Sequence, residues 1–182
     1  MKISNILYYT GFLLYKKDIC ILIIIVFVFF FSSCTNISTT PASMIFPKYE
    51  HTINYKNNNI YVLGGLSYGK YLNTTEVYNI YSNQWNLSND LHINRAKHQS
   101  VIYNNNIMIT GGINYDGAIK SVEVYNTLFG WQEKALLNYS RYSHNMFVLD
   151  DKLYISGGYN SKDLPNNTTE KFINNESKWE IQ

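Results

Sequence analysis

The sequence contains one unit repeated three times, and this repeat restricts the possible folds more than any other feature. A pair of adjacent glycines recurs at intervals of 47 and 46 residues, and four other residue types recur in register with it. The markers are Gly64, Gly65, Gly111, Gly112, Gly157 and Gly158; Glu76, Glu123 and Glu170; Tyr78, Tyr125 and Phe172; Trp85, Trp131 and Trp179; and His51, His98 and His144. Self-similarity at such a period predicts a repeat architecture.

Each repeat reads as four short β-strands, which the middle repeat illustrates. Apolar and β-branched residues predict strands over 98–103 and 107–110, joined by an asparagine turn at 104–106. The second strand ends at a glycine pair, the third covers 122–125, and the fourth contains Trp131. We therefore expect one four-stranded antiparallel sheet from each repeat.

This pattern resembles the kelch motif: a hydrophobic strand that ends in a double glycine, a V-E-V-type strand followed by Tyr, and a Trp about six residues later. The resemblance covers residues 48–182 and implies an all-β fold, a partial kelch-type β-propeller of three four-stranded antiparallel blades. We expect the blades at 48–94, 95–140 and 141–182. Propellers close with roughly four to eight blades, so three form an incomplete ring.

The repeated residues have structural explanations. The glycine pairs suit a close approach of backbones, and the repeated Tyr, Phe and Trp residues suit cores between blades. Each repeated histidine is expected to bond within its own blade rather than to bind a metal, and each repeated glutamate to bond a donor of a neighbouring blade. The third repeat reads TEKF where V-E-V-Y is expected, which predicts that blade three is the least well packed.

The N-terminus predicts export. Residues 19–31 are apolar, follow Lys16 and Lys17 closely, and precede Ser32, Ser33 and Cys34. A helix of that length spans about 20 Å, less than the ~30 Å hydrocarbon core, and suits a signal peptide. Residues 1–34 resemble a bacterial lipoprotein signal, which implies a lipid-modified Cys34, a flexible tether over 35–47 and attachment to the cell envelope. A cleaved signal without lipid and an uncleaved anchor are the alternatives.

Composition excludes several classes of function. Residues 35–182 contain 12 basic and 12 acidic residues without a basic cluster, so we expect no nucleic-acid partner. Both cysteines lie within the first 34 residues, which leaves no cysteine for a metal site in the repeats. No nucleophile elbow, phosphate loop or H-E-x-x-H motif is present, so we expect no catalytic residue and no cofactor.

The loops are the expected binding region, because propellers usually bind ligands through the loops on one face. The candidate residues are Tyr68, Tyr71, Arg95, Tyr115, Tyr139, Arg141, Tyr142 and Tyr159. Tyrosines beside amides and a few charges suit a protein or glycan ligand. Three interpretations stay open: a non-catalytic binding module, with a homodimer that completes a six-bladed ring as one possible assembly; a periplasmic enzyme such as a sialic acid-type sugar mutarotase, which the family resemblance allows; and a fragment of a longer kelch protein.

Overall fold

The computed structural model describes residues 42–182. The predicted signal peptide, the predicted lipid site at Cys34 and residues 35–41 of the predicted tether lie outside the described residues. The regular elements of residues 42–182 are all β-strands, which confirms the predicted all-β class. None of these residues forms a helix long and apolar enough to cross a membrane.

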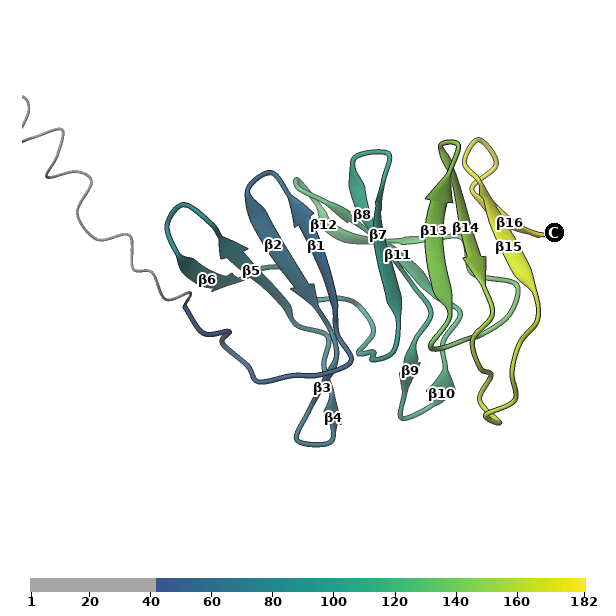
Figure 1. Ribbon diagram of the computed structural model, residues 1–182, viewed down its shortest axis with the longest axis horizontal. Coiled ribbons are helices and arrows are strands. Elements are labelled where there is room, and N and C mark those ends of the chain that lie inside the picture. The colour runs from purple at the N-terminus through teal and green to yellow at the C-terminus, as the bar shows by residue number, and fades with distance from the viewer. Residues whose placement is uncertain (1–41) are drawn as a thin grey trace, which may run out of the picture. The chain divides into compact units, whose positions relative to one another are not determined.

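Three antiparallel four-stranded sheets form the body of the structure (Figure 1). Blade one has β1 (Thr52–Lys56), β2 (Asn59–Leu63), β5 (Thr75–Asn79) and β6 (Gln84–Leu87). Blade two has β7 (Gln99–Tyr103), β8 (Asn106–Thr110), β11 (Val122–Asn126) and β12 (Gly130–Lys134). Blade three has β13 (Asn145–Leu149), β14 (Lys152–Ser156), β15 (Thr169–Ile173) and β16 (Lys178–Ile181). The predicted partial propeller of three four-stranded blades is confirmed.

In each blade the strands pair in chain order, so the first strand lies at one edge and the last at the other. The first strands β1, β7 and β13 are neighbours across the blades. Each first hairpin turns through two residues with positive φ: Asn57 and Asn58, Asn104 and Asn105, and Asp150 and Asp151. Asn and Asp tolerate this conformation and form the tight turns that match strand twist, as the sequence analysis expected for blade two.

Two small hairpins extend from blades one and two. They consist of β3 (Leu66–Ser67) with β4 (Lys70–Tyr71), and β9 (Ile113–Asn114) with β10 (Gly117–Ala118). Each joins the second and third strands of its blade, after the glycine pair. In blade three the corresponding loop has only an isolated bridge between Tyr159 and Pro165.

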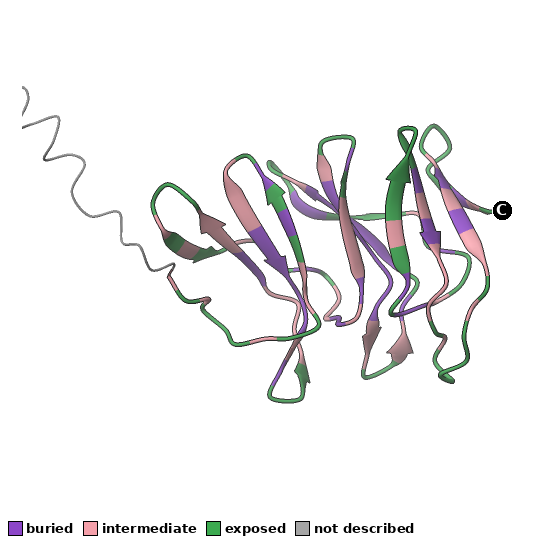
Figure 2. Ribbon diagram, in the orientation of Figure 1, coloured by how far each residue is buried: buried purple, intermediate pink, exposed green. Residues whose placement is uncertain are grey.

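Two hydrophobic cores lie between the blades. Figure 2 shows buried residues, in purple, on strands of each blade. The core between blades one and two contains Tyr61, Leu63, Leu91, Ile107, Ile109, Tyr125 and Trp131. The core between blades two and three contains Tyr103, Met108, Val122, Val124, Leu137, Leu153, Ile155, Phe172 and Trp179. The repeated aromatic pairs of blades two and three therefore pack against the preceding blade.

The expectation that blade three is the least well packed is wrong for its aromatic pair. Phe172 is 4 % exposed and Trp179 is 5 % exposed, whereas Tyr78 and Trp85 of blade one are only half-buried. All three pairs have similar ring separations, between 5.1 and 5.2 Å. The difference arises because the pair faces the preceding blade, and no blade precedes blade one in the described residues.

Residues 42–47, which fall in the predicted tether, lie against blade one. The Trp85 indole N–H donates to the carbonyl of Ala42 at 2.7 Å, and the amide of Ile45 donates to Glu76 Oε2 at 2.6 Å. The Trp131 indole N–H likewise donates to the carbonyl of Asn89 at 3.0 Å. Residues 42–47 thus make the contacts of a linker that enters a blade, and are held rather than free.

Candidate functional site

The connections between blades and the connections between second and third strands lie at the same end of the strands (Figure 1). Antiparallel strands in chain order must place these connections together, with the tight turns at the opposite end. We call this surface the loop face; it comprises residues 64–74, 88–98, 111–121, 135–144 and 157–168. All the binding residues predicted from the sequence fall in these segments.

Three of the predicted tyrosines lie on the hairpins of blades one and two. Tyr68 is 89 % exposed and Tyr115 is 67 % exposed, so both rings are available to a ligand. Tyr71 and Tyr115 meet edge to face, with ring centres 4.9 Å apart. The Tyr115 hydroxyl also donates to the carbonyl of Gly69 at 3.4 Å. The two hairpins are therefore joined into one aromatic surface across the blade boundary.

A second aromatic group lies on the loops of blade three. Tyr142 and Tyr159 stack with ring centres 5.7 Å apart, and Tyr159 is 43 % exposed. The Tyr142 hydroxyl donates to Asp163, and this hydrogen bond, with burial, raises the pKa of Tyr142 to about 12. Lys97 Nζ lies 5.6 Å from the centre of the Tyr142 ring. Tyr142 itself is buried, so it supports Tyr159 rather than presenting its own ring.

Tyr139 is 45 % exposed. It lines a surface hollow with the polar residues that follow Pro165, together with Asn160 and Ser140. One exposed ring beside several amides provides both stacking and hydrogen-bonding groups. Of the six predicted tyrosines, five are thus available at the surface and one is buried.

Arg95 and Arg141 do not belong to the binding surface, in contrast to the prediction. Both are completely buried. Arg95 pairs with Glu123 at 2.6 Å and also donates to the carbonyl of Gly111 at 2.7 Å. Arg141 pairs with Glu170 at 2.7 Å in the same way. A guanidinium without solvent exposure cannot contact a ligand, so both arginines fix the linker to its blade.

The repeated glutamates form their ion pairs within their own blades, whereas Glu123 and Glu170 also accept amides from the end of the preceding blade's segment, so the expected bond to a neighbouring blade is confirmed in part. Each carboxylate accepts from the basic residue that enters the blade, and Glu76 pairs with Lys48 at 2.7 Å in blade one. Each also accepts a backbone amide of the linker, such as that of His92 at 2.8 Å for Glu123. Burial lowers the pKa of Arg95, while the charge of Glu123 opposes this change.

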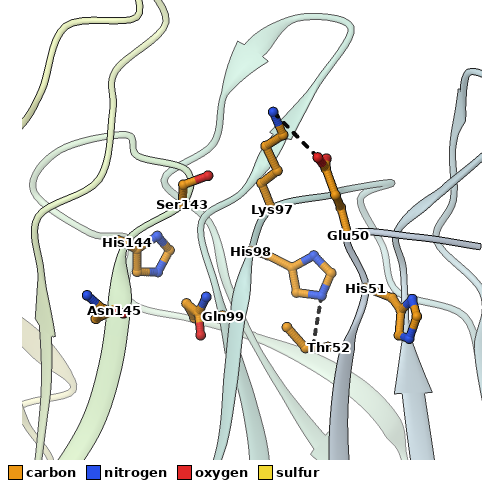
Figure 3. Close-up of a pocket in the computed structure, with 9 residues that line it drawn as sticks. All are labelled: Glu50, His51, Thr52, Lys97, His98, Gln99, Ser143, His144 and Asn145. Atoms are coloured by element: carbon orange, nitrogen blue, oxygen red, sulfur yellow. Dashed lines mark hydrogen bonds and ion pairs between the residues drawn. The ribbon is translucent and has the colours of Figure 1, made fainter.

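The histidines behave in the opposite way, since they bond across the blade boundaries. His98 Nε2 lies 2.9 Å from the hydroxyl of Thr52 in blade one (Figure 3). His144 Nε2 lies 2.9 Å from the hydroxyl of Thr110 in blade two. The expectation that each histidine bonds within its own blade is therefore wrong, and these rings connect neighbouring blades.

Burial keeps these imidazoles neutral. Desolvation, with the nearby charge of Arg95, lowers the pKa of His98 well below its usual range. Desolvation and the charge of Arg141 lower the pKa of His144 to about 3. The Nδ1 atoms of both rings are buried without a hydrogen-bond partner. Within residues 42–182, no group of His, Cys, Asp and Glu is arranged to hold a metal ion.

A polar pocket opens beside the histidines, and three residues with positive φ, Glu50, Lys97 and Ser143, line it (Figure 3). The amide of Lys97 donates to the carbonyl of Glu50 at 3.1 Å, and the amide of Ser143 donates to that of Lys97 at 2.8 Å. Lys97 Nζ also lies 3.7 Å from Glu50 Oε1. A chain of backbone hydrogen bonds thus links one position of each blade to the next.

The first glycine of the pair in blade one and in blade two is required by the following blade. A Cβ at Gly64 would lie 2.6 Å from the carbonyl oxygen of Arg95, and one at Gly111 would lie 2.5 Å from that of Arg141. Such contacts exclude any side chain, and both glycines also have positive φ. The second glycines, Gly65 and Gly112, donate their amides to the same two carbonyls at 2.8 and 2.9 Å.

Sequence reasoning missed the contribution of the linkers and of Lys97. The indole acceptors Ala42, Asn89 and Ala135 each lie six residues before Lys48, Arg95 and Arg141. This spacing is visible in the sequence, but the acceptors are backbone carbonyls and leave no signature of residue type. The ion pairs were detectable, because each basic residue precedes its glutamate by 28 or 29 residues.

Comparison with protein families finds a similarity to the Kelch motif in one part of the chain. Residues 47–91 match the Kelch motif, a range that holds the whole sheet of blade one. The repeats at blades two and three show the same strand order and the same glycine pairs. A comparison with curated proteins gave no match.

Proposed function

We propose that this chain is a non-catalytic binding module whose loop face takes a protein or glycan ligand. The observation that carries the proposal is the group of exposed tyrosines on that face, above all Tyr68 and Tyr115. Large exposed aromatic side chains next to amides are typical of interaction surfaces. Kelch repeats commonly mediate protein binding, which favours a protein ligand.

The proposed binding surface has two parts. The first is the joined hairpin surface of Tyr68, Tyr71 and Tyr115. The second contains Tyr159 on the loop of blade three and Tyr139 in the connection between blades two and three. Lys97, beside Tyr142, adds a half-exposed positive charge next to the second part. A ligand that covers both parts would combine stacking on rings with hydrogen bonds to loop amides.

The experiment is a binding screen of the full chain against a glycan array and a displayed peptide library. We expect Tyr68→Ala and Tyr115→Ala each to weaken binding of the selected glycan or peptide by at least tenfold, in keeping with aromatic hot spots. Tyr81→Ala is the matched control, since Tyr81 is 77 % exposed but lies in the turn between β5 and β6 at the opposite end. Equal effects of all three substitutions would contradict the proposal.

We further propose that the module is exported and held at a bacterial cell envelope by lipid on Cys34. The support is the sequence pattern of residues 16–34, a basic start followed by an apolar run, small residues and cysteine. Cys34→Ser should abolish membrane attachment, because acyl chains supply ~0.8 kcal/mol per buried CH₂. Envelope protein that keeps residues 19–31 would contradict the lipid anchor.

A second copy of the chain is a further proposed partner of this module. The three blades leave one sheet face open at each end of the described row, and a six-bladed ring would cover both. The contacts that such an assembly would use can be derived from the two interfaces within the chain.

A further inference from the structure

Each blade uses its two faces for different neighbours. In blade two, Val101, Tyr103 and Met108 face blade three, while Tyr125 and Trp131 face blade one. The repeat therefore gives every blade two different faces. One packs against the following blade, and we call it the receiving face; the other packs against the preceding blade, and we call it the entering face. The two interfaces inside the chain are templates for any further blade that binds at either end.

Blade three presents its receiving face without cover from any described residue. Phe147, Leu149 and Tyr154 occupy the positions that Val101, Tyr103 and Met108 hold in blade two. Phe147 is 42 % exposed and Leu149 is 56 % exposed. The rings of Phe147 and Tyr154 stack 5.6 Å apart. This face thus keeps large apolar side chains at the positions that form a core in blade two.

The backbone of blade three is also shaped for a following blade. Among the described residues the amide of Gly158 has no acceptor, whereas Gly65 and Gly112 donate to Arg95 and Arg141 of the following blade. A Cβ at Gly157 would meet nothing nearer than 3.8 Å, yet Gly64 and Gly111 have no room for one. The third glycine pair thus leaves space and a free donor where a following blade would lie.

Blade one carries the complementary groups on its entering face. Lys48 holds the position of Arg95 and Arg141, whose carbonyls accept the glycine amides. Ile53 is 59 % exposed and Tyr55 is 56 % exposed, and Trp85 is only half-buried. The amide of Glu50 has no acceptor among the described residues, although the equivalent amides of Lys97 and Ser143 are bonded to the preceding blade.

We propose that the open face of blade three binds blade one of a second copy, an assembly that rests on the proposed role of the chain as an interaction module. By analogy with the internal interfaces, the Gly158 amide donates to the carbonyl of the partner's Lys48. The carbonyl of Ser143 accepts from the amide of the partner's Glu50. Each free group on one face then meets its missing counterpart on the other, which favours a second copy over an unrelated protein.

A closed ring requires two copies of the chain. Propellers close with roughly four to eight blades, and six is the only multiple of three in that range. A two-fold axis along the channel makes both new interfaces equivalent, and closure leaves no open face. Exposed apolar patches beyond a few hundred Å² are uncommon on monomers, so the assembly also removes an unfavourable surface.

A cysteine pair tests the register of the interface. Asn54 contacts Ser100 across the first internal boundary, and the equivalent residues at the new boundary are Phe147 and the partner's Ile53. The full-chain double variant Phe147→Cys, Ile53→Cys should form a covalent dimer under mild oxidation. Leu128→Cys with Ile53→Cys is the control, since Leu128 is 83 % exposed in the turn between β11 and β12. Each single variant controls for Cys20 and Cys34.

A charge on the open face tests the association itself. The full chain should sediment as a dimer at micromolar concentration, and Phe147→Asp should make it a monomer with an unchanged circular dichroism spectrum. Leu128→Asp should remain a dimer. A wild-type monomer, a dimer that persists in Phe147→Asp, or equal crosslinking by the control pair would each overturn the assembly. Glycan or peptide binding that survives in monomeric Phe147→Asp separates this interface from the proposed loop-face function.

Discussion

The buried interface between blades two and three and the open face of blade three are built from equivalent positions, yet they differ in exposure. Tyr103 is 9 % exposed at the interface, whereas Leu149, its counterpart on the open face, is 56 % exposed. On blade one the same contrast appears for tryptophan, because Trp131 is 2 % exposed and Trp85 is half-buried. The repeat thus sets which residues point outward, and the neighbouring blade alone decides their burial.

The largest expected effect compares two tryptophans at equivalent positions. Trp131→Ala should lower the free energy of unfolding by about 3–5 kcal/mol, because it removes a buried indole and leaves a cavity between blades one and two. Trp85→Ala should cost clearly less, since its ring is only half-buried. Urea denaturation followed by circular dichroism, below the concentration at which chains associate, measures both. Equal losses would show that the end of blade one is covered.

A second comparison uses two leucines of the hairpin that β13 and β14 form, Leu149 in β13 and Leu153 in β14. Leu153 is completely buried against blade two, so Leu153→Ala should cost about 2–5 kcal/mol. Leu149→Ala should change the free energy of unfolding of the monomer by less than about 0.5 kcal/mol, as is usual for surface positions. In the proposed dimer the same Leu149 substitution should weaken association instead. A large loss of monomer stability from Leu149→Ala would contradict the open face.

The sequence was sufficient to predict the blades, their strands and the positions of the aromatic pairs, because these follow from residue type at a fixed period. It was misleading for Arg95 and Arg141, because charged residues in loops are normally exposed and only the fold brings a buried carboxylate beside each. The direction of the histidine contacts also required the structure. His98 lies in the sequence of blade two, but its ring reaches Thr52 through the close approach that Gly64 permits.

The free energy of unfolding should also decrease in acid, because His98 and His144 are buried at the interfaces between blades. The pKa values of His98 and His144 are lowered by burial in the fold, so the unfolded chain binds protons first as the pH falls. Stability is therefore fully present above about pH 6.5 and should fall by ~1.4 kcal/mol per pH unit for each histidine below it. For His144 this loss continues down to its folded pKa of about 3.

Urea denaturation between pH 7 and pH 5 measures this dependence, before most carboxylates begin to titrate. His144→Gln should reduce the slope with pH by about a third to a half, since it removes one of two fully buried imidazoles and burial also lowers the pKa of His51. Only the slope is compared, so a lower stability of His144→Gln at pH 7 does not affect the test. An unchanged slope would contradict the burial of a neutral His144.

Amide hydrogen exchange at Gly158, followed by nuclear magnetic resonance, tests most directly that blade three keeps a binding site for a further blade. Gly65 and Gly112 donate to the carbonyl of the following blade and should be protected at all concentrations. Gly158 should exchange rapidly in dilute solution and gain protection similar to that of Gly112 as the chain concentration rises. Rapid exchange at Gly158 at every concentration, with Gly112 still protected, would contradict the account.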